Sequence, residues 1–354
     1  MNALLLAPIA ALWNRPPASA AGRVAAGLAI SMLLASIIHA GEVMRDRSRG
    51  APYPKVFFQR GVNFTAENGY DPQPALPILD QLKEHGVNAI ALVPYGFFRA
   101  NEPVIHYAGG MERSDHIETL TALAHQRGMK VLLKPQLWTH SGFPGDIDWP
   151  DARQRGRWFA EYRKFLEYYA GLAAKIHADL FSVGVEFVKM TPYEAEWRAL
   201  IARARQLYPG PLVYSATQGP EFETIRFWDA LDYIGLNEYY PLPDDLSTAA
   251  VVRTVEAVQN KFGKPVIFTE AGFSTYAHPN RAPWDETPRA LAPGDQARCY
   301  EAVFKAFYKK PWFQGVYWWK VGTNGFGGPE DGSHTPWRKP AMDTVRRWYL
   351  HGGR

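Results

Sequence analysis

Two glutamates of this sequence each end a short apolar stretch, where burial of a carboxylate needs compensation. Glu186 follows the run LFSVGV at 180–185, and Glu270 follows VIFT at 266–269. Burying a carboxylate costs several kcal/mol unless a partner stabilises it. A pair of carboxyl groups, one protonated and one ionised, is the chemistry that breaks glycosidic bonds. Glu186 and Glu270 are therefore the first candidates for catalysis.

Strand-like segments alternate with amphipathic, helix-like segments from residue 55 onward. The expected strands are 58–65, 87–95, 129–138, 179–187, 211–217, 232–240, 264–273 and 314–323. The expected helices include 75–85, 116–127, 157–176, 194–207, 247–262 and 296–308. Eight strands that alternate with helices predict an α/β fold, a (β/α)8 TIM barrel over residues 55–350. A doubly wound sheet is disfavoured, because no glycine-rich phosphate-binding turn is present.

The two-residue alternation of a strand predicts which side chains enter the barrel. It places Gly184 and Glu186 on one face of the fourth strand, and Val266, Phe268 and Glu270 on one face of the seventh. The two carboxylates would meet at the C-terminal rim of the barrel, from strands expected to lie opposite each other. For either glutamate alone, a rim salt bridge is the alternative.

Polar and aromatic residues near the ends of other strands extend the candidate site. The same alternation aligns Asn237 with Tyr239 on the sixth strand, and Tyr317 with Trp319 on the eighth. Trp319 offers a flat face for a sugar ring, and Asn237 and Lys134 are candidates for hydroxyl contacts. The remaining candidates for substrate binding are Asn63, Tyr95, Gln136 and Trp138. Ordinary core or rim roles are the alternative for these residues.

Composition argues against several other function classes. The chain has 39 Lys and Arg against 35 Asp and Glu, so no nucleic-acid partner is expected. The single cysteine, Cys299, excludes an internal disulfide, and its helical surroundings predict a buried structural thiol. No metal-binding or phosphate-binding motif is present, so neither a metal nor a cofactor is expected.

The N-terminal part of the sequence predicts export. An apolar run at 24–40 is close to the length of about 17–25 residues that a membrane span needs. No clear small-x-small cleavage site follows it, so an uncleaved signal anchor over residues 1–40 is favoured over a cleaved signal peptide. A polar linker is expected at 41–54. The protein is then expected to be anchored in the inner membrane, periplasmic or secreted, and its oligomeric state stays open.

Several motifs together resemble glycoside hydrolase family 113, over roughly residues 56–350. The motifs are GVNF (61–64), KVLLKPQLW (130–138), SVGVEF (182–187), FWDALDYIGLNEYYPL (227–242), KPVIFTEAGF (264–273), GVYWWK (315–320) and KPA (339–341). The resemblance implies a retaining clan A enzyme that acts on β-1,4-mannan, a carbohydrate partner. It also implies Glu186 as general acid/base, Glu270 as nucleophile, Tyr239 as a donor to the nucleophile, and Trp319 as a sugar platform.

Three positions depart from the expected pattern. Val185 stands where most clan A enzymes have asparagine, Gln136 stands where histidine is expected, and the stretch 215–225 lacks an Asn-Trp pair. Because these positions line the expected cleft, hydrolysis of another β-glycan or of an exopolysaccharide stays open. A non-catalytic, membrane-tethered carbohydrate-binding barrel is the alternative from a different class.

Overall fold

Eight parallel strands close into a barrel in a computed structural model that describes residues 57–353 except 68, 100–101, 111 and 140–142. Their order around the barrel is β1-β11-β10-β9-β8-β7-β5-β2. The strands are β1 (Gln59–Thr65), β2 (Ala89–Leu92), β5 (Lys130–Leu133), β7 (Leu180–Val185), β8 (Leu212–Thr217), β9 (Tyr233–Glu238), β10 (Val266–Ala271) and β11 (Phe313–Gly322). Each was expected from its apolar run, so the prediction of a (β/α)8 barrel is confirmed.

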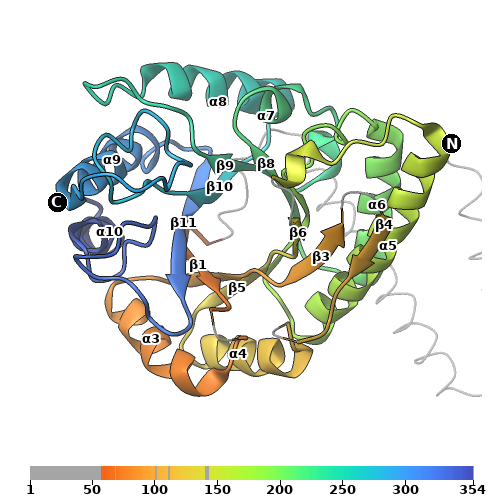
Figure 1. Cartoon of the computed structure of the whole chain (residues 1–354), viewed down its shortest axis with the longest axis horizontal. Helices are drawn as coiled ribbons and strands as arrows, with labels where there is room; N and C mark the ends of the chain where they lie inside the picture. Colours follow the sequence, from red (N-terminus) through yellow and green to blue (C-terminus); the bar gives the residue numbers. More distant parts are fainter. Residues whose placement is uncertain (1–56, 68, 100–101, 111, 140–142, 354) are drawn as a thin grey trace, which may run out of the picture. The chain divides into compact units, whose positions relative to one another are not determined.

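Helices surround the strands on the outside, as Figure 1 shows in a view into the barrel. The long ones are α3 (Pro72–Glu84), α4 (Ser114–Gln126), α5 (Ala152–Lys175), α6 (Glu194–Leu207), α8 (Ala249–Phe262), α9 (Pro293–Phe307) and α10 (Pro340–His351). The short ones are η1 (Pro144–Asp146), α7 (Pro220–Thr224) and η2 (Trp228–Ala230). Local sequence fixes several starts: Asp151, for example, caps α5 by accepting a hydrogen bond from Gln154 N at 2.9 Å. Cys299 is buried in α9, as predicted.

Apolar side chains form two layers, one inside the barrel and one between strands and helices. The inner layer is small, as expected for a barrel filled by alternate strand residues. It consists of Ala89, Ala91, Val93, Leu132, Leu180, Val213, Tyr233, Ile267 and Tyr317. The outer layer is larger and aromatic; Trp318 belongs to it and stacks on Tyr300 of α9 with ring centroids 3.9 Å apart. Tyr317 inside and Trp318 outside confirm the predicted alternation in β11.

Two register shifts contradict the simple alternation predicted for the strands that carry the glutamates. The register of β7 against β8 shifts within Ser182–Val185. A Cβ on Gly184 would lie 2.6 Å from the ring of Tyr214 and 2.9 Å from that of Trp197, so Gly184 faces the helix layer. The prediction that Gly184 shares a face with Glu186 is therefore wrong, because the register shift interrupts the two-residue alternation of the strand.

The same irregularity occurs in β10. Val266 and Phe268 pack in the outer layer, whereas Ile267 lies inside the barrel. The register against β9 shifts between Phe268 and Glu270, and this shift brings Glu270 back toward the barrel mouth. The prediction that Val266, Phe268 and Glu270 share a face is wrong for the first two residues.

A second, three-stranded sheet lies beside the barrel, with the order β4-β3-β6. It consists of β3 (Tyr95–Arg99), β4 (Glu102–His106) and β6 (Gln136–Thr139). Two expected strands, 87–95 and 129–138, are each divided between the barrel and this sheet. Pro94 and Pro135 lie at the two division points, where a residue without an N–H group interrupts the ladder.

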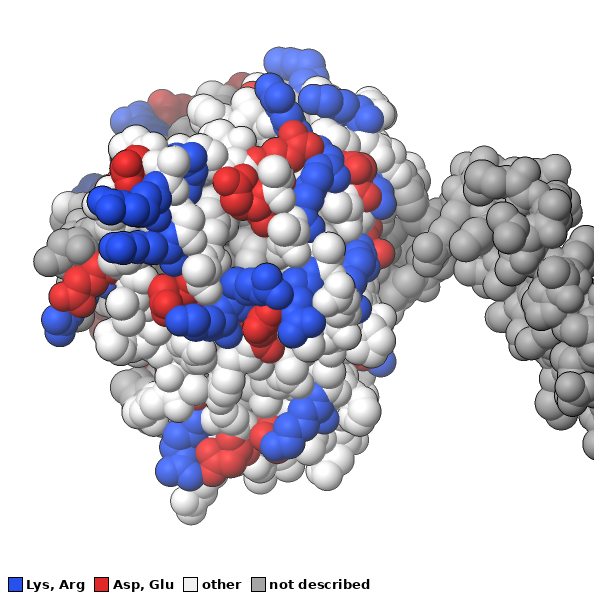
Figure 2. Space-filling view, turned by 90° about the vertical axis from the view of Figure 1, so that its right-hand side faces the viewer, with Lys and Arg blue, Asp and Glu red and all other residues white. Residues whose placement is uncertain are grey.

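Charged side chains are mixed on the surface. Figure 2 shows Lys and Arg interspersed with Asp and Glu on the face that it presents. On α5 and α6, for example, Glu167 accepts from Arg163 at 2.8 Å and from Arg203 at 2.7 Å. Such interleaving gives this face no continuous basic patch for a polyanion.

The predicted N-terminal elements lie outside the described residues. This applies to the signal anchor or signal peptide over residues 1–40 and to the linker over 41–54. Within the part of the chain that the structure describes, none of the helices has the length and apolar character to cross a membrane.

Candidate active site

Glu186 and Glu270 both lie at the C-terminal mouth of the barrel, and both are largely buried, with 9% and 5% of their surfaces exposed. Glu186 follows β7 directly, and Glu270 lies near the end of β10. Two strands, β8 and β9, separate β7 from β10 on one side of the barrel and four on the other, so the two strands lie across the barrel from each other, one position short of directly opposite. Asn237 of β9 bonds Glu186, and Tyr239, the residue that follows β9, bonds Glu270, so this part of the chain links the two halves of the site.

Glu270 receives a hydrogen bond on each carboxylate oxygen. Lys134 Nζ donates to Oε1, and the hydroxyl of Tyr239 donates to Oε2 at 3.0 Å. Lys134 has no exposed surface, and its ammonium group lies 5.2 Å from the ring centroid of Trp319. The cation therefore lies between the carboxylate and an aromatic face, whereas the sequence suggested a contact with substrate hydroxyls.

Glu186 has a different environment, without a cation in hydrogen-bond contact among the described residues. Asn237 Nδ2 donates to its Oε1 at 3.0 Å, and the side chain of Thr217 also bonds it. Burial, followed by the nearby charge of Glu270, raises the pKa of Glu186 to about 7. The two carboxyl groups therefore have unlike partners: Glu270 lies against a lysine ammonium group, whereas Glu186 lies against a neutral amide donor.

The backbone at Glu186 has an unusual conformation. Its φ is 57°, in the left-handed region that glycine prefers, and its N–H donates to Ser215 O at 2.9 Å. The next residue, Phe187, donates its N–H to the hydroxyl of Tyr214 at 2.9 Å. Contacts to β8 therefore hold the chain in the conformation that turns Glu186 toward Glu270.

Asn237 and Asn63 lie beneath the carboxylates. Asn237 accepts from Thr269 Oγ1 at 2.9 Å, which fixes the side-chain amide so that its Nδ2 points at Glu186. Asn63 is fully buried, and its Nδ2 donates to the main-chain oxygens of Thr269 and Tyr317 at 3.1 and 3.0 Å. The structure thus places Asn63 under the site, and its contact with substrate stays a prediction.

The predicted aromatic and amide contacts lie nearer the surface. Trp319 is half-buried against the inner apolar layer. Trp138 is 50% exposed on β6, and Gln136 begins the same strand. Gln136 Oε1 is buried, with no hydrogen-bond partner among the described residues. Trp319, Trp138 and Gln136 therefore lie at the same mouth of the barrel as the carboxylate pair.

Glu221, which the sequence analysis did not single out, braces the segments on both sides of Glu186. It accepts a hydrogen bond from the Tyr214 hydroxyl at 2.7 Å and one from Thr217 N at 2.6 Å. Tyr214 in turn holds Phe187, and Thr217 bonds Glu186 itself. Burial, together with the charge of Glu186, raises the pKa of Glu221 to about 8. The only signal in the sequence is an acidic residue just after the Gly-Pro that follows strand 212–217.

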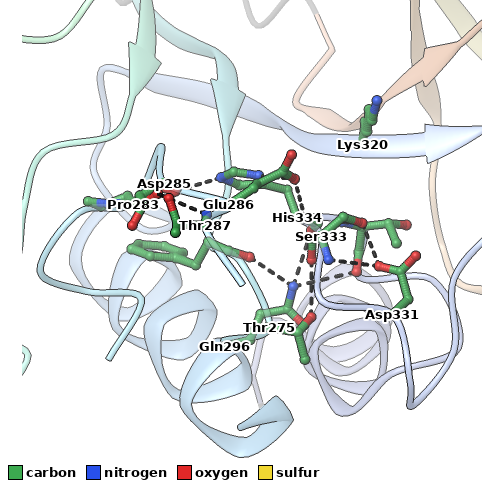
Figure 3. A network of polar contacts seen from close by, with 12 residues as sticks. Thr275, Pro283, Asp285, Glu286, Thr287, Gln296, Lys320, Asp331, Ser333 and His334 are labelled. Carbon is green, nitrogen blue, oxygen red and sulfur yellow. Dashed lines mark hydrogen bonds and ion pairs between the residues drawn. The ribbon is translucent and has the colours of Figure 1, made fainter. Parts of the chain in front are cut away.

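A polar network joins the loop after β10 to the loop after β11 (Figure 3). His334 Nδ1 lies 2.5 Å from Glu286 Oε1, and His334 Nε2 lies 2.6 Å from Pro283 O. The hydrogen bond from His334 holds the pKa of Glu286 down at about 2. The ring of His334 meets that of Tyr239 edge-on at 6.0 Å. Both loops are therefore tied together beside the residue that donates to Glu270.

No metal site accompanies the carboxylates in the described part of the chain. No group of three or more His, Cys, Asp or Glu side chains there is placed to hold a metal ion. The chemistry of this mouth is that of two carboxyl groups with unlike surroundings, a phenol and an aromatic platform.

Comparisons with known proteins identify similar chains. The family model of Glycoside Hydrolase Family 113 matches residues 62–329. The solved GH113 β-mannanase of Alicyclobacillus acidocaldarius, in complex with ManMIm, is 32% identical; the match covers 83% of this chain and 97% of that chain, with a TM-score of 0.77. A second solved GH113 β-1,4-mannanase is 23% identical, with 84% and 100% covered and a TM-score of 0.78. No curated protein sequence matches this chain.

Proposed function

The chain belongs to glycoside hydrolase family 113 and is a retaining glycoside hydrolase; from this premise we propose that it cleaves β-1,4-mannan with Glu270 as nucleophile and Glu186 as general acid/base. The observation that carries the assignment of roles is the contrast between the two carboxyl groups. Glu270 lies against Lys134 and Tyr239, whereas burial and the neighbouring charge raise the pKa of Glu186 to about 7.

In the first step, Glu270 attacks the anomeric carbon from the face opposite the leaving group. The glycosidic C–O bond breaks, and Glu186 gives its proton to the departing oxygen. The hydroxyl of Tyr239 and the ammonium group of Lys134 hold Glu270 in position for this attack. The product of the step is a covalent ester between the sugar and Glu270.

In the second step, a water molecule attacks the anomeric carbon and the ester bond breaks. Once Glu270 is esterified its charge is gone, so the pKa of Glu186 falls and the carboxylate takes a proton from that water. Glu270 leaves as a carboxylate, and the sugar keeps its original β configuration.

The choice of mannan is supported by the family and by the solved structure that is 32% identical, which is described as a β-mannanase. Incubation of the protein with β-mannan, glucomannan, cellulose and xylan oligosaccharides tests this choice through the products released. We expect turnover of mannan and glucomannan. Release of products from xylan or cellulose alone would contradict the proposed substrate and leave the retaining chemistry in place.

A polymeric substrate also bears on localisation. Polysaccharides outside the cell do not cross a membrane unaided, so an enzyme that acts on them there has to be exported. The apolar run at 24–40 is consistent with such export. We therefore keep an inner-membrane-anchored, periplasmic or secreted location as part of the proposal.

Glu221 is expected to act as a positioning residue for Glu186. Glu221→Gln leaves one acceptor oxygen where Thr217 N and the Tyr214 hydroxyl use two, so the turn that carries Glu186 loses part of its support. We expect kcat/KM on mannan oligosaccharides to fall about tenfold, while an aryl mannoside with an activated leaving group, which needs little acid assistance, changes less than about twofold.

Glu223→Gln is the matched control for Glu221→Gln, because Glu223 lies on the same short helix and is exposed. It should leave both substrates within about twofold of the wild type. An equal loss on both substrates in Glu221→Gln would indicate a general loss of structure and contradict the positioning role.

A further inference from the structure

The three-stranded sheet beside the barrel has one buried and one exposed face. Its buried face packs on α5, where a Cβ on Gly96 would lie 2.6 Å from the ring of Phe165. The opposite face exposes three large apolar side chains, Phe97 (44%), Val104 (41%) and Trp138 (50%). We call these three residues the apolar patch. Single exposed apolar residues are ordinary, but three on one small sheet call for an explanation.

The strand pairing places the two aromatic members of the patch side by side. Phe97 of β3 is paired with Trp138 of β6, and on its other side with His106 of β4. Arg99 and Glu102, also paired with each other, are exposed on the same sheet. The face therefore offers flat apolar surfaces bordered by groups that form hydrogen bonds.

The apolar patch continues directly from the carboxylate pair. Tyr95, two residues before Phe97, meets the ring of Trp138 edge-on at 5.9 Å. Tyr95 also packs against the inner apolar layer of the barrel, as Trp319 does. Lys134, which bonds Glu270, lies between β5 and β6, and one residue separates it from Gln136 at the start of β6.

We propose that the apolar patch is a subsite for sugar units of the polysaccharide that are remote from the bond being cleaved. This proposal rests on the proposed function, because it takes a β-glycan as the occupant. Pyranose rings present apolar C–H faces that stack on exposed aromatic rings, and their hydroxyls suit polar neighbours such as His106. The patch adjoins the carboxylate pair through Tyr95, which packs both on the inner layer of the barrel and on Trp138, and this adjacency favours a polymer held at Glu186 and Glu270 over a second copy of the chain.

The patch makes the efficiency of the enzyme depend on chain length. Sugars bound there contribute binding energy that a short substrate lacks, and part of it orients the bond at the carboxylates. Long chains should therefore be cleaved with higher kcat/KM than short ones. A long polymer should be bound at sugar units within the chain and not at its ends.

Kinetics on substrates of increasing length test this subsite with the full-length chain. The proteins compared are wild type, Phe97→Ala, Trp138→Ala, the double variant and Leu350→Ala. Leu350 is an exposed apolar residue of α10. It lies beside Gly86, where an added Cβ would be 2.9 Å from the Leu350 side chain. Because Gly86 precedes β2, Leu350 lies at the N-terminal end of the barrel, away from the carboxylates. We expect each patch variant to lose about tenfold in kcat/KM on the longest mannan oligosaccharides and less than about twofold on an aryl β-mannoside. Leu350→Ala should match wild type on all substrates.

Failure of the subsite and failure of the proposed substrate give different results. A uniform loss on all substrates, or no loss on any, overturns the subsite while mannan hydrolysis stands. If wild type cleaves no mannan, affinity electrophoresis in gels that contain mannan, glucan or xylan decides. Retardation of wild type that the double variant relieves supports the subsite, and absence of retardation in all three gels overturns it. A change from dimer to monomer in the double variant with unaltered kinetics would assign the patch to self-association and likewise overturn the subsite.

Discussion

Glu270→Ala is expected to lower kcat on mannan oligosaccharides by roughly four orders of magnitude or more, the scale on which loss of a covalent nucleophile acts. The variant has no group that can form the ester intermediate. Azide added with an activated aryl mannoside should enter the vacated space, on the face opposite the leaving group, and yield the α-glycosyl azide. NMR determines the configuration of this product. An α configuration shows that the missing carboxylate is the group that attacks the anomeric carbon.

Glu270→Gln controls for the structural effect of the alanine variant. Alanine leaves the buried Lys134 without the partner it has in the wild type, which is a destabilising change in its own right. Glutamine keeps one acceptor oxygen for Lys134 and places its NH2 group beside the Tyr239 hydroxyl, but it cannot attack as a carboxylate. Both variants should be equally inactive, with thermal unfolding checked by circular dichroism. Near-wild-type turnover in either, or a β-glycosyl azide from Glu270→Ala, would contradict the role of nucleophile.

Glu186→Gln is expected to separate the two chemical steps. On mannan oligosaccharides, kcat/KM should fall by about 10² to 10⁴, since the leaving oxygen no longer receives a proton. An aryl mannoside with an activated leaving group should still form the ester at a substantial rate. Its hydrolysis then lacks a base, so a burst of released phenol followed by slow turnover is expected in stopped-flow measurements.

The pH dependence of kcat/KM gives a second test of the same residue. Glu186 must be protonated to act as an acid, and its pKa is raised to about 7. Activity should therefore be retained below about pH 7 and fall about tenfold per pH unit above it, in the direction of deprotonation. In Glu186→Gln this fall should be absent for the activated substrate. If the same fall persists in the variant, another group causes it.

The sequence predicted the barrel well because each of its strands is an apolar run bounded by turns. It also predicted the approximate position of both glutamates. The helix α10 was overlooked, although Ala341, Val345 and Trp348 follow a helical period that a systematic count would detect. In the second sheet, β6 lies largely within an expected strand and β3 begins at the end of another, and Pro94 and Pro135 are the signals that divide them; β4 was not expected at all.

The contacts between side chains were harder to predict, for physical reasons. Lys134 and Glu270 are 136 residues apart, and only closure of the barrel brings them together. The orientation of Gly184 depends on a register shift set by hydrogen bonds with β8, and a rule based on alternation along one strand cannot contain that information. The role of Glu221 was not predicted for a similar reason. It depends on the hydrogen bonds that Glu221 accepts from Tyr214 and Thr217, and these are not visible in the sequence.

The positive φ of Glu186 has a consequence for engineering this protein. A non-glycine residue in the left-handed region costs on the order of 1 kcal/mol or more, so glycine at position 186 would relax the backbone and remove a buried carboxyl group. A search that ranks substitutions by stability alone would therefore favour a change at the residue proposed to supply the proton. Thermostabilisation of this barrel has to exclude position 186 in advance, and the bracing residues around it belong to the same protected set.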